Sequence, residues 1–446
     1  MIQYAMNYSP ASFPHRLVVG LISGLFMLAM TDVARGHGAG EEQPSFDAAT
    51  TGGGESGEAG MFISEQLSRQ LEGVRGLLDK NQNKEAITRL EAMEARSNSY
   101  NRYENAILHQ TLAYAYATVN DYPKAAETFE EALSFKALPR EAMLSVMQNL
   151  GQLYIVTESY TKGIAVLEDW MRRAKPREIS PQMRVLLGNA YFHQRDYAKA
   201  VAQLNKAITA VDHPDKSWFQ LLAGVDQQWG HYNDMADVLQ QAISVYPGEK
   251  SFWQQLSAAY RQLHQDKKAA AVLALACNTG LCDGNDKIYL ARLYLYIGAP
   301  VKSVHLIQAS LKDGTLSGVA EDWQLLAQSW QQAREPDKAA AAYREAAKRS
   351  TDSGDADFHL GQIYVQQARW QAAADAFTRA LKKGKLSSPG RTHLMLGVAR
   401  YYLGQPDTAL QSLKAAAGYK DTEIEARRWL QHVRPAVTAA ADKPAS

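Results

Sequence analysis

The stretch LGQLY at residues 150–154 decides the fold of this chain, because it returns along the sequence. Its leucine, glycine and tyrosine recur in LGNAY at residues 187–191 and in LGQIY at residues 360–364. Self-similarity at a period of about 34 residues is the signature of a repeat architecture. Equivalent leucines follow one another at intervals of 34 to 38 residues, at Leu112, Leu150, Leu187, Leu222, Leu256, Leu290, Leu326, Leu360 and Leu396.

Each repeat predicts two antiparallel helices. A small, a large apolar and another small residue follow each leucine at helical spacing, as in Ala125, Phe129 and Ala132. The small residues let the facing helix approach, and the large residue fills the seam. A single hairpin cannot bury this surface, whereas stacked hairpins can. We therefore predict an all-α superhelix, an α-solenoid of about ten hairpins closed by a C-terminal capping helix.

The combined pattern resembles the tetratricopeptide repeat, which reads W-x2-L-G-x2-Y followed by A-x3-F-x2-A. The resemblance covers most of residues 67–429. It implies a tetratricopeptide superhelix, but the fold alone does not imply a function. The fullest matches are Trp253, Leu256, Tyr260, Ala269, Leu273 and Ala276, and then Trp323, Leu326, Trp330, Ala339, Tyr343 and Ala346.

Composition narrows the class of partner. The chain has 446 residues, of which 46% are hydrophobic, enough for a continuous core. Lys and Arg number 48 against 47 Asp and Glu. This balance gives no net field for nucleic acid or an acidic membrane surface, so neither is an expected partner.

The two ends of the chain differ from the repeats. Residues 1–36 combine Arg16, an apolar run and a small-x-small ending, which predicts a cleavable signal peptide. The alternative is a membrane anchor, although the apolar run is short for a span of about 20 residues. Residues 37–61 are rich in Gly and Glu and predict a flexible linker. The superhelix is then predicted over 62–434, followed by a disordered tail over 435–446.

The chain carries two cysteines, Cys277 and Cys282, at the end of a predicted second helix. In an exported protein this spacing predicts a local disulfide, and the alternatives are two buried thiols or a metal site. We find no paired spacing of further metal ligands and no catalytic motif. The sequence therefore predicts no metal, no cofactor and no enzymatic activity.

The first helices carry a polar but almost uncharged face. We expect the residues two before and two after each repeat leucine to line the inner groove, because they lie four apart on one helix. A primary amide both donates and accepts, so a row of glutamines can bind the backbone of an extended polypeptide. The alternative is ordinary solvated surface built from good helix formers. The predicted groove residues are Gln110, Tyr114, Gln148, Gln152, Asn189, Gln220, Gln254, Gln324, Gln328 and Gln362.

Longer stretches resemble the periplasmic tetratricopeptide proteins that accompany TonB, ExbB and ExbD energy-transduction systems. The resemblance implies a non-enzymatic periplasmic scaffold that assists TonB-dependent uptake of iron or haem and binds an extended partner, such as a segment of TonB, ExbB or ExbD. It implies no stable membrane insertion after signal cleavage. The alternative function is a general periplasmic adaptor for envelope assembly or polysaccharide export. The stretches are SWFQLLAGV (217–225), FWQQLSAAY (252–260), LARLYLYIGAPVKSVHLIQASLKDG (290–314), WQLLAQSWQQAREPDKA (323–339) and SSPGRTHLMLGVARYYLG (387–404).

Overall fold

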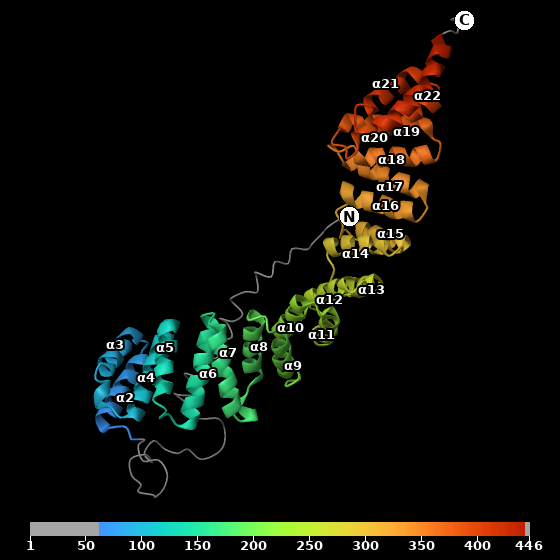
Figure 1. Ribbon diagram of the computed structural model, residues 1–446. Coiled ribbons are helices and arrows are strands. Elements are labelled where there is room, and N and C mark those ends of the chain that lie inside the picture. Colours follow the sequence, from blue (N-terminus) through green and yellow to red (C-terminus); the bar gives the residue numbers. More distant parts are fainter. Residues whose placement is uncertain (1–61, 442–446) are drawn as a thin grey trace. The chain divides into compact units, whose positions relative to one another are not determined.

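The computed structural model describes residues 62–441, with side chains as far as Arg434 (Figure 1). The predicted signal peptide and linker lie outside this range. Within it the chain forms 21 α-helices and no strand, which confirms the predicted all-helical solenoid. The helices divide between two units, residues 62–231 and residues 232–441.

The first unit contains nine helices, taken in order of the chain. They are α2 (Glu65–Asp79), α3 (Asn83–Glu94), α4 (Arg102–Thr118), α5 (Tyr122–Ser134), α6 (Arg140–Val156), α7 (Tyr160–Arg173), α8 (Pro181–His193), α9 (Tyr197–Ile208) and α10 (Lys216–Trp229). Two short 3-10 turns, η3 (Ser97–Ser99) and η4 (Pro176–Glu178), precede α4 and α8.

The second unit continues the same alternation of first and second helices. It consists of α11 (Tyr232–Val245), α12 (Lys250–Gln262), α13 (Asp266–Asn278), α14 (Gly284–Tyr296), α15 (Pro300–Lys312), α16 (Ala320–Gln332), α17 (Pro336–Arg349), α18 (Asp355–Gln366), α19 (Trp370–Lys383), α20 (Pro389–Tyr402), α21 (Pro406–Ala416) and α22 (Glu423–Ala441). The last helix continues to Ala441, whereas we predicted a disordered tail from residue 435. The alanine-rich sequence at the end of this helix favours helix formation.

The repeat glycine allows the two helices of a hairpin to pack closely. In four repeats this glycine faces the large apolar residue sixteen positions later, in the second helix. A β-carbon on Gly188, Gly361 or Gly397 would come within 2.6–2.9 Å of that side chain, closer than real contacts. The missing side chain therefore sets how closely the two helices approach. The pairs are Gly151–Leu167, Gly188–Leu204, Gly361–Phe377 and Gly397–Leu413.

Every turn from a first helix to a second helix passes through one left-handed residue. Such a residue ends a helix, and glycine adopts the conformation at least cost. Glycine occupies three of these turns, while the others hold residues with a β-carbon. The turn residues, with φ between 55° and 80°, are Asn81, Asn120, Glu158, Arg195, Gly230, His264, Gly298, Arg334, Ala368 and Gly404.

The repeat tyrosine links consecutive hairpins in the first unit. Its hydroxyl donates to a glutamate of the preceding second helix, and a lysine ammonium lies 5.1–5.2 Å from its ring centroid. Burial, and then the glutamate that accepts the hydrogen bond, raise the pKa of each tyrosine well above its usual range. The sets are Glu91–Tyr116–Lys124, Glu130–Tyr154–Lys162 and Glu168–Tyr191–Lys199.

Candidate functional site

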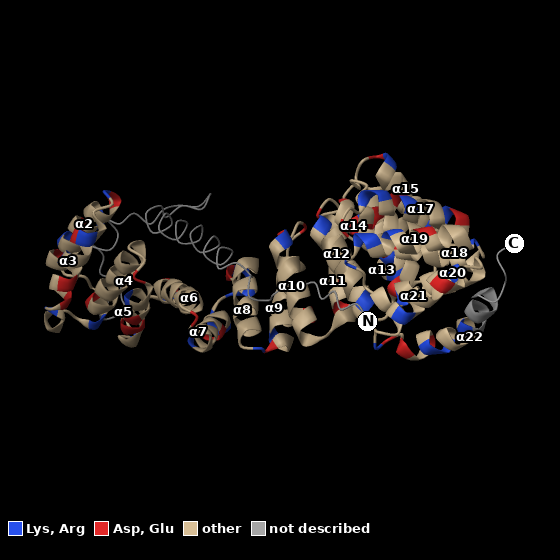
Figure 2. Cartoon of the chain, turned by 90° about the horizontal axis from the view of Figure 1, so that it is seen from above, with Lys and Arg blue, Asp and Glu red and all other residues tan. Residues whose placement is uncertain are grey.

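The predicted groove residues all lie on first helices, but the structure does not expose them equally. Gln328 is exposed, and Gln110, Gln148, Asn189, Gln220, Gln254, Gln324 and Gln362 are partly buried. Tyr114 and Gln152 are buried. Figure 2 shows that charged residues of both signs are spread over both units.

Tyr114 and Gln152 belong to the packing between first helices rather than to a contact surface. The Tyr114 hydroxyl accepts a hydrogen bond from Asn149 Nδ2 at 2.9 Å and lies 3.2 Å from Ser145 Oγ on α6. The Gln152 amide donates to Met183 Sδ of α8 at 3.4 Å and is 2% exposed. The prediction that these two side chains contact a partner is therefore corrected, because the next repeat covers them.

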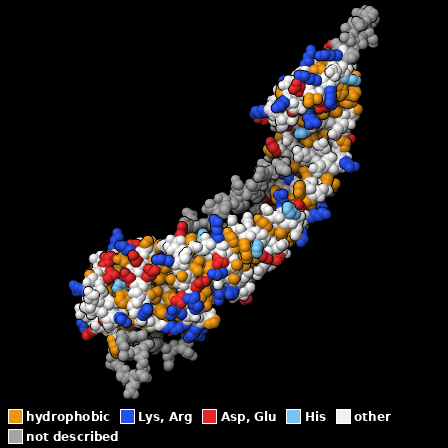
Figure 3. Space-filling model, in the orientation of Figure 1, with side chains coloured by type: hydrophobic (Ala, Val, Ile, Leu, Met, Phe, Trp, Pro, Cys, Tyr) orange, Lys and Arg blue, Asp and Glu red, His pale blue; other side chains and the backbone are white. Residues whose placement is uncertain are grey.

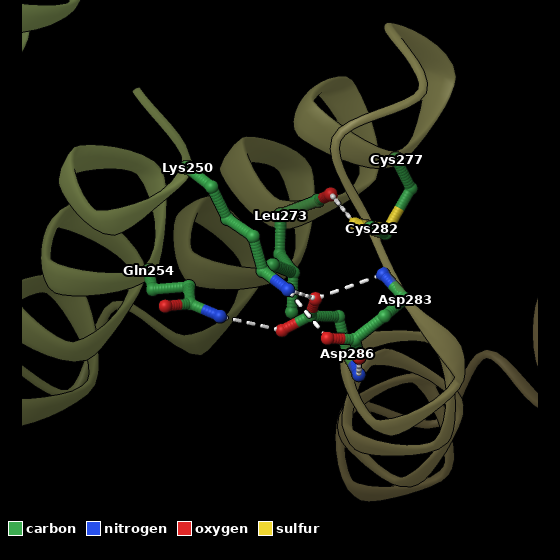
Figure 4. A network of polar contacts seen from close by, with 7 residues as sticks. All are labelled: Lys250, Gln254, Leu273, Cys277, Cys282, Asp283 and Asp286. Carbon is green, nitrogen blue, oxygen red and sulfur yellow. Dashed lines mark hydrogen bonds and ion pairs between the residues drawn. A yellow bond between two sulfur atoms is a disulfide. The ribbon is translucent and has the colours of Figure 1, made fainter. Parts of the chain in front are cut away.

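Gln254 is also engaged within the fold. Its amide donates to Asp286 Oδ1 at 2.6 Å, and Lys250 lies 2.6 Å from a carboxylate oxygen of both Asp283 and Asp286 (Figure 4). Asp283 and Asp286 also form a capping box at the start of α14. Lys250 lowers the pKa of Asp283, and the two aspartates, Asp283 first, raise the pKa of Lys250. This network joins α12 to α14.

The two cysteines lie beside this network. Cys277 at the end of α13 and Cys282 form a disulfide, which closes the loop that leads directly into Asp283 (Figure 4). The Cys282 Sγ atom also lies 3.8 Å from the Leu273 carbonyl oxygen. The bond therefore fixes the end of α13 against the beginning of α14.

We expect protein from its native host to resist alkylation at both cysteines until a reductant is added. The local loop is short, so reduction should lower the free energy of unfolding by less than the roughly 3 kcal/mol typical of a fifteen-residue loop. Mass spectrometry of protein alkylated before and after reduction checks this. Full modification of Cys277 and Cys282 without reductant would show that the native protein carries thiols.

A shallow depression of about 430 Å³ lies on the second unit, between α17, α18 and α19. Asp357, a buried residue of its lining, accepts from Arg379 Nε at 2.9 Å and pairs with Lys383 Nζ at 2.7 Å. Arg344 donates to the Tyr364 hydroxyl at the edge of the depression. Asp357 pairs with both Arg379 and Lys383, so the depression has the character of an inter-repeat ion-pair network.

One polar cluster was not predicted from the sequence. Glu94, His109 and Glu131 come from α3, α4 and α5, and their ligand atoms lie within 4.8 Å of one another. Their spacing in the chain follows no local ligand motif, so only the stacking of two repeats reveals them.

The geometry defines an α-solenoid of helical hairpins, and comparison with known proteins identifies the repeat. Residues 149–213 and 325–388 match the family model described as Tetratricopeptide repeat. These two segments are therefore tetratricopeptide repeats, in keeping with the helical hairpins of the structure.

Solved structures with this repeat resemble the chain at low identity. A tetratricopeptide repeat protein from Parabacteroides merdae is 13% identical, with a TM-score of 0.35, over 67% of this chain and 99% of that one. The C-terminal part of a repeat protein from Cytophaga hutchinsonii is 15% identical, with a TM-score of 0.37, over 63% and 95%. YrrB, described as having an unusual peptide-binding site, is 17% identical, with a TM-score of 0.33, over 39% and 85%.

No curated protein sequence matches this chain. Within the part of the chain that the structure describes, no helix has the length and apolar character needed to cross a membrane.

Proposed function

We propose that this protein is a non-enzymatic periplasmic scaffold that holds an extended polypeptide segment against its first helices and assists TonB-dependent uptake of iron or haem. The tetratricopeptide fold supports the coarser part of this proposal, a protein-interaction scaffold, because stacked hairpins create an extended binding surface. The resemblance of residues 217–225 and 290–314 to periplasmic companions of TonB systems supports the finer part.

The proposed binding surface rests on one observation, the unpaired amide groups of two glutamines on α16. Gln324 is partly buried and Gln328 is exposed, one helical turn apart. Among the described residues, neither side chain has a hydrogen-bond partner. Gln362 on α18, the first helix of the next repeat, is equivalent to Gln328. Its Oε1 is 3.0 Å from His359 Nδ1. Free amides can donate to and accept from the backbone of an extended chain.

A deletion strain tests the biological role. We expect it to grow normally with plentiful free iron and poorly when iron must enter through an energy-requiring receptor. Crosslinking in cells followed by affinity capture should recover transducer components. Normal growth on every receptor-dependent source, with capture of envelope-assembly or polysaccharide-export proteins instead, would favour the alternative adaptor function.

A double variant tests the surface itself. Changing Gln324→Glu and Gln328→Glu removes two amide donors and adds two charges while keeping side-chain shape and helix propensity. We expect this variant to fold normally and to fail to restore growth of the deletion strain on receptor-dependent iron.

The matched control is Gln308→Glu with Gln411→Glu, which adds the same charge at exposed positions of the second helices α15 and α21. This control should restore growth. Equal rescue by both variants would show that the α16 face is ordinary solvated surface, even if the deletion phenotype is as expected.

A further inference from the structure

Three side chains from three successive helices of the first unit meet at one point. Glu94 is the last residue of α3, His109 lies in the middle of α4, and Glu131 lies near the end of α5. The His109 Nε2 atom is 3.3 Å from Glu94 Oε1 and 3.3 Å from Glu131 Oε2. Figure 3 shows acidic side chains gathered over these helices.

The orientation of His109 is fixed from the opposite side of its ring. The residue is 5% exposed, and its Nδ1 lies 2.8 Å from the backbone carbonyl oxygen of Asn105. A carbonyl oxygen only accepts, so Nδ1 carries a proton and Nε2 is the ring nitrogen that faces the two carboxylates. A histidine that donates one ring N–H to a backbone carbonyl is the usual arrangement of a metal-binding histidine. The Phe135 ring, 5.2 Å from the imidazole, packs against it.

The distances around His109 suit a set of metal ligands. A protonated imidazole that donates to a single carboxylate forms a bond of about 2.7–2.9 Å. Both observed separations are 3.3 Å. Tetrahedral zinc with bonds of about 2.0–2.1 Å places neighbouring ligand atoms about 3.3–3.4 Å apart. Both distances from His109 therefore suit ligands around one ion, and all three ligand atoms lie within 4.8 Å of one another.

The local charge also favours a cation. Glu91 already accepts from Tyr116, and Glu130 accepts from Tyr154, so these two acids serve the links between repeats. Glu94 and Glu131 are the carboxylates left facing the histidine.

We propose that Glu94, His109 and Glu131 bind one divalent transition-metal ion of the Zn²⁺ type, which fastens α3 to the hairpin of α4 and α5. One imidazole nitrogen among the donors favours Zn²⁺ over Mg²⁺ or Ca²⁺, which prefer all-oxygen sites. The Glu131 side chain is 53% exposed and that of Glu94 is 36% exposed, so a water molecule completes the coordination from the solvent side.

Calorimetric titration of the untagged full chain, freed of metal by a chelator, tests the site with Zn²⁺ as the probe. We expect one Zn²⁺ ion per chain at this site, unaffected by excess Mg²⁺. The Co²⁺-loaded protein should show the visible absorption of a four-coordinate ion. Glu131→Gln removes a solvent-facing ligand with little effect on packing, and it should weaken Zn²⁺ binding by more than about 100-fold, as loss of a ligand exceeds loss of an outer partner.

The matched control is Glu127→Gln, which removes the same charge from an exposed position one turn earlier on α5. It should bind Zn²⁺ as the unaltered protein does. His109→Gln provides a second ligand variant, with its fold checked by circular dichroism. Absence of Zn²⁺ binding, or equal binding by the Glu131→Gln and Glu127→Gln variants, would overturn the proposal and leave the cluster as an ion pair.

Discussion

Truncation of Phe377 to alanine should lower the free energy of unfolding of the second unit by about 3–5 kcal/mol. Phe377 is fully buried in α19 and packs in one cluster with Tyr343, Leu360 and Phe358. Its removal loses the transfer free energy of the ring and leaves a cavity that the neighbouring helices fill only in part. Because each repeat contacts only its neighbours, the loss should appear in the unfolding of this unit.

Denaturant unfolding followed by tryptophan fluorescence measures the effect, since Trp323, Trp330 and Trp370 pack against the same cluster. Tyr296→Ala, at an aromatic residue of the same unit that is 71% exposed, is the control and should change stability by no more than about 0.5 kcal/mol. A loss at Phe377 as small as that at Tyr296 would mean that α19 does not pack in this register.

Gly361→Ala should destabilise the second unit, although alanine is the better helix former. The added β-carbon would lie 2.6 Å from Phe377 Cε1 and 2.8 Å from two further atoms of that buried ring. Overpacking of a core costs about 1–3 kcal/mol, whereas the change from glycine to alanine inside a helix gains about 1 kcal/mol. The ring is rigid and enclosed, so we expect the clash to exceed the gain.

Gly73→Ala on α2 is the matched control, because nothing lies within 4 Å of the position that its β-carbon would take. There the helix preference acts alone, and stability should rise by about 0.5–1 kcal/mol. The two variants therefore change the free energy of unfolding in opposite directions. A gain of stability in both would show that the helices of the α18–α19 hairpin are farther apart than the structure places them.

The sequence predicted the helix positions of the groove residues but not their burial. The positions two before and two after the repeat leucine do fall on first helices, as helical periodicity predicts. Their burial could not be predicted, because it depends on the neighbouring repeat: Met183 covers Gln152, and Asp286 engages Gln254. Gln328 stays exposed at a position equivalent to that of Gln152.

The sequence by itself determined the helical repeat, the hairpin unit and the residues that fill each seam, because these follow from local spacing within about 34 residues. The leucine–glycine–tyrosine pattern carries this information without any knowledge of neighbouring repeats. Only the tertiary structure decided which polar groups meet between repeats. Glu94, His109 and Glu131 come together because the first and second hairpins stack in one register, and no periodicity within a single helix encodes that meeting.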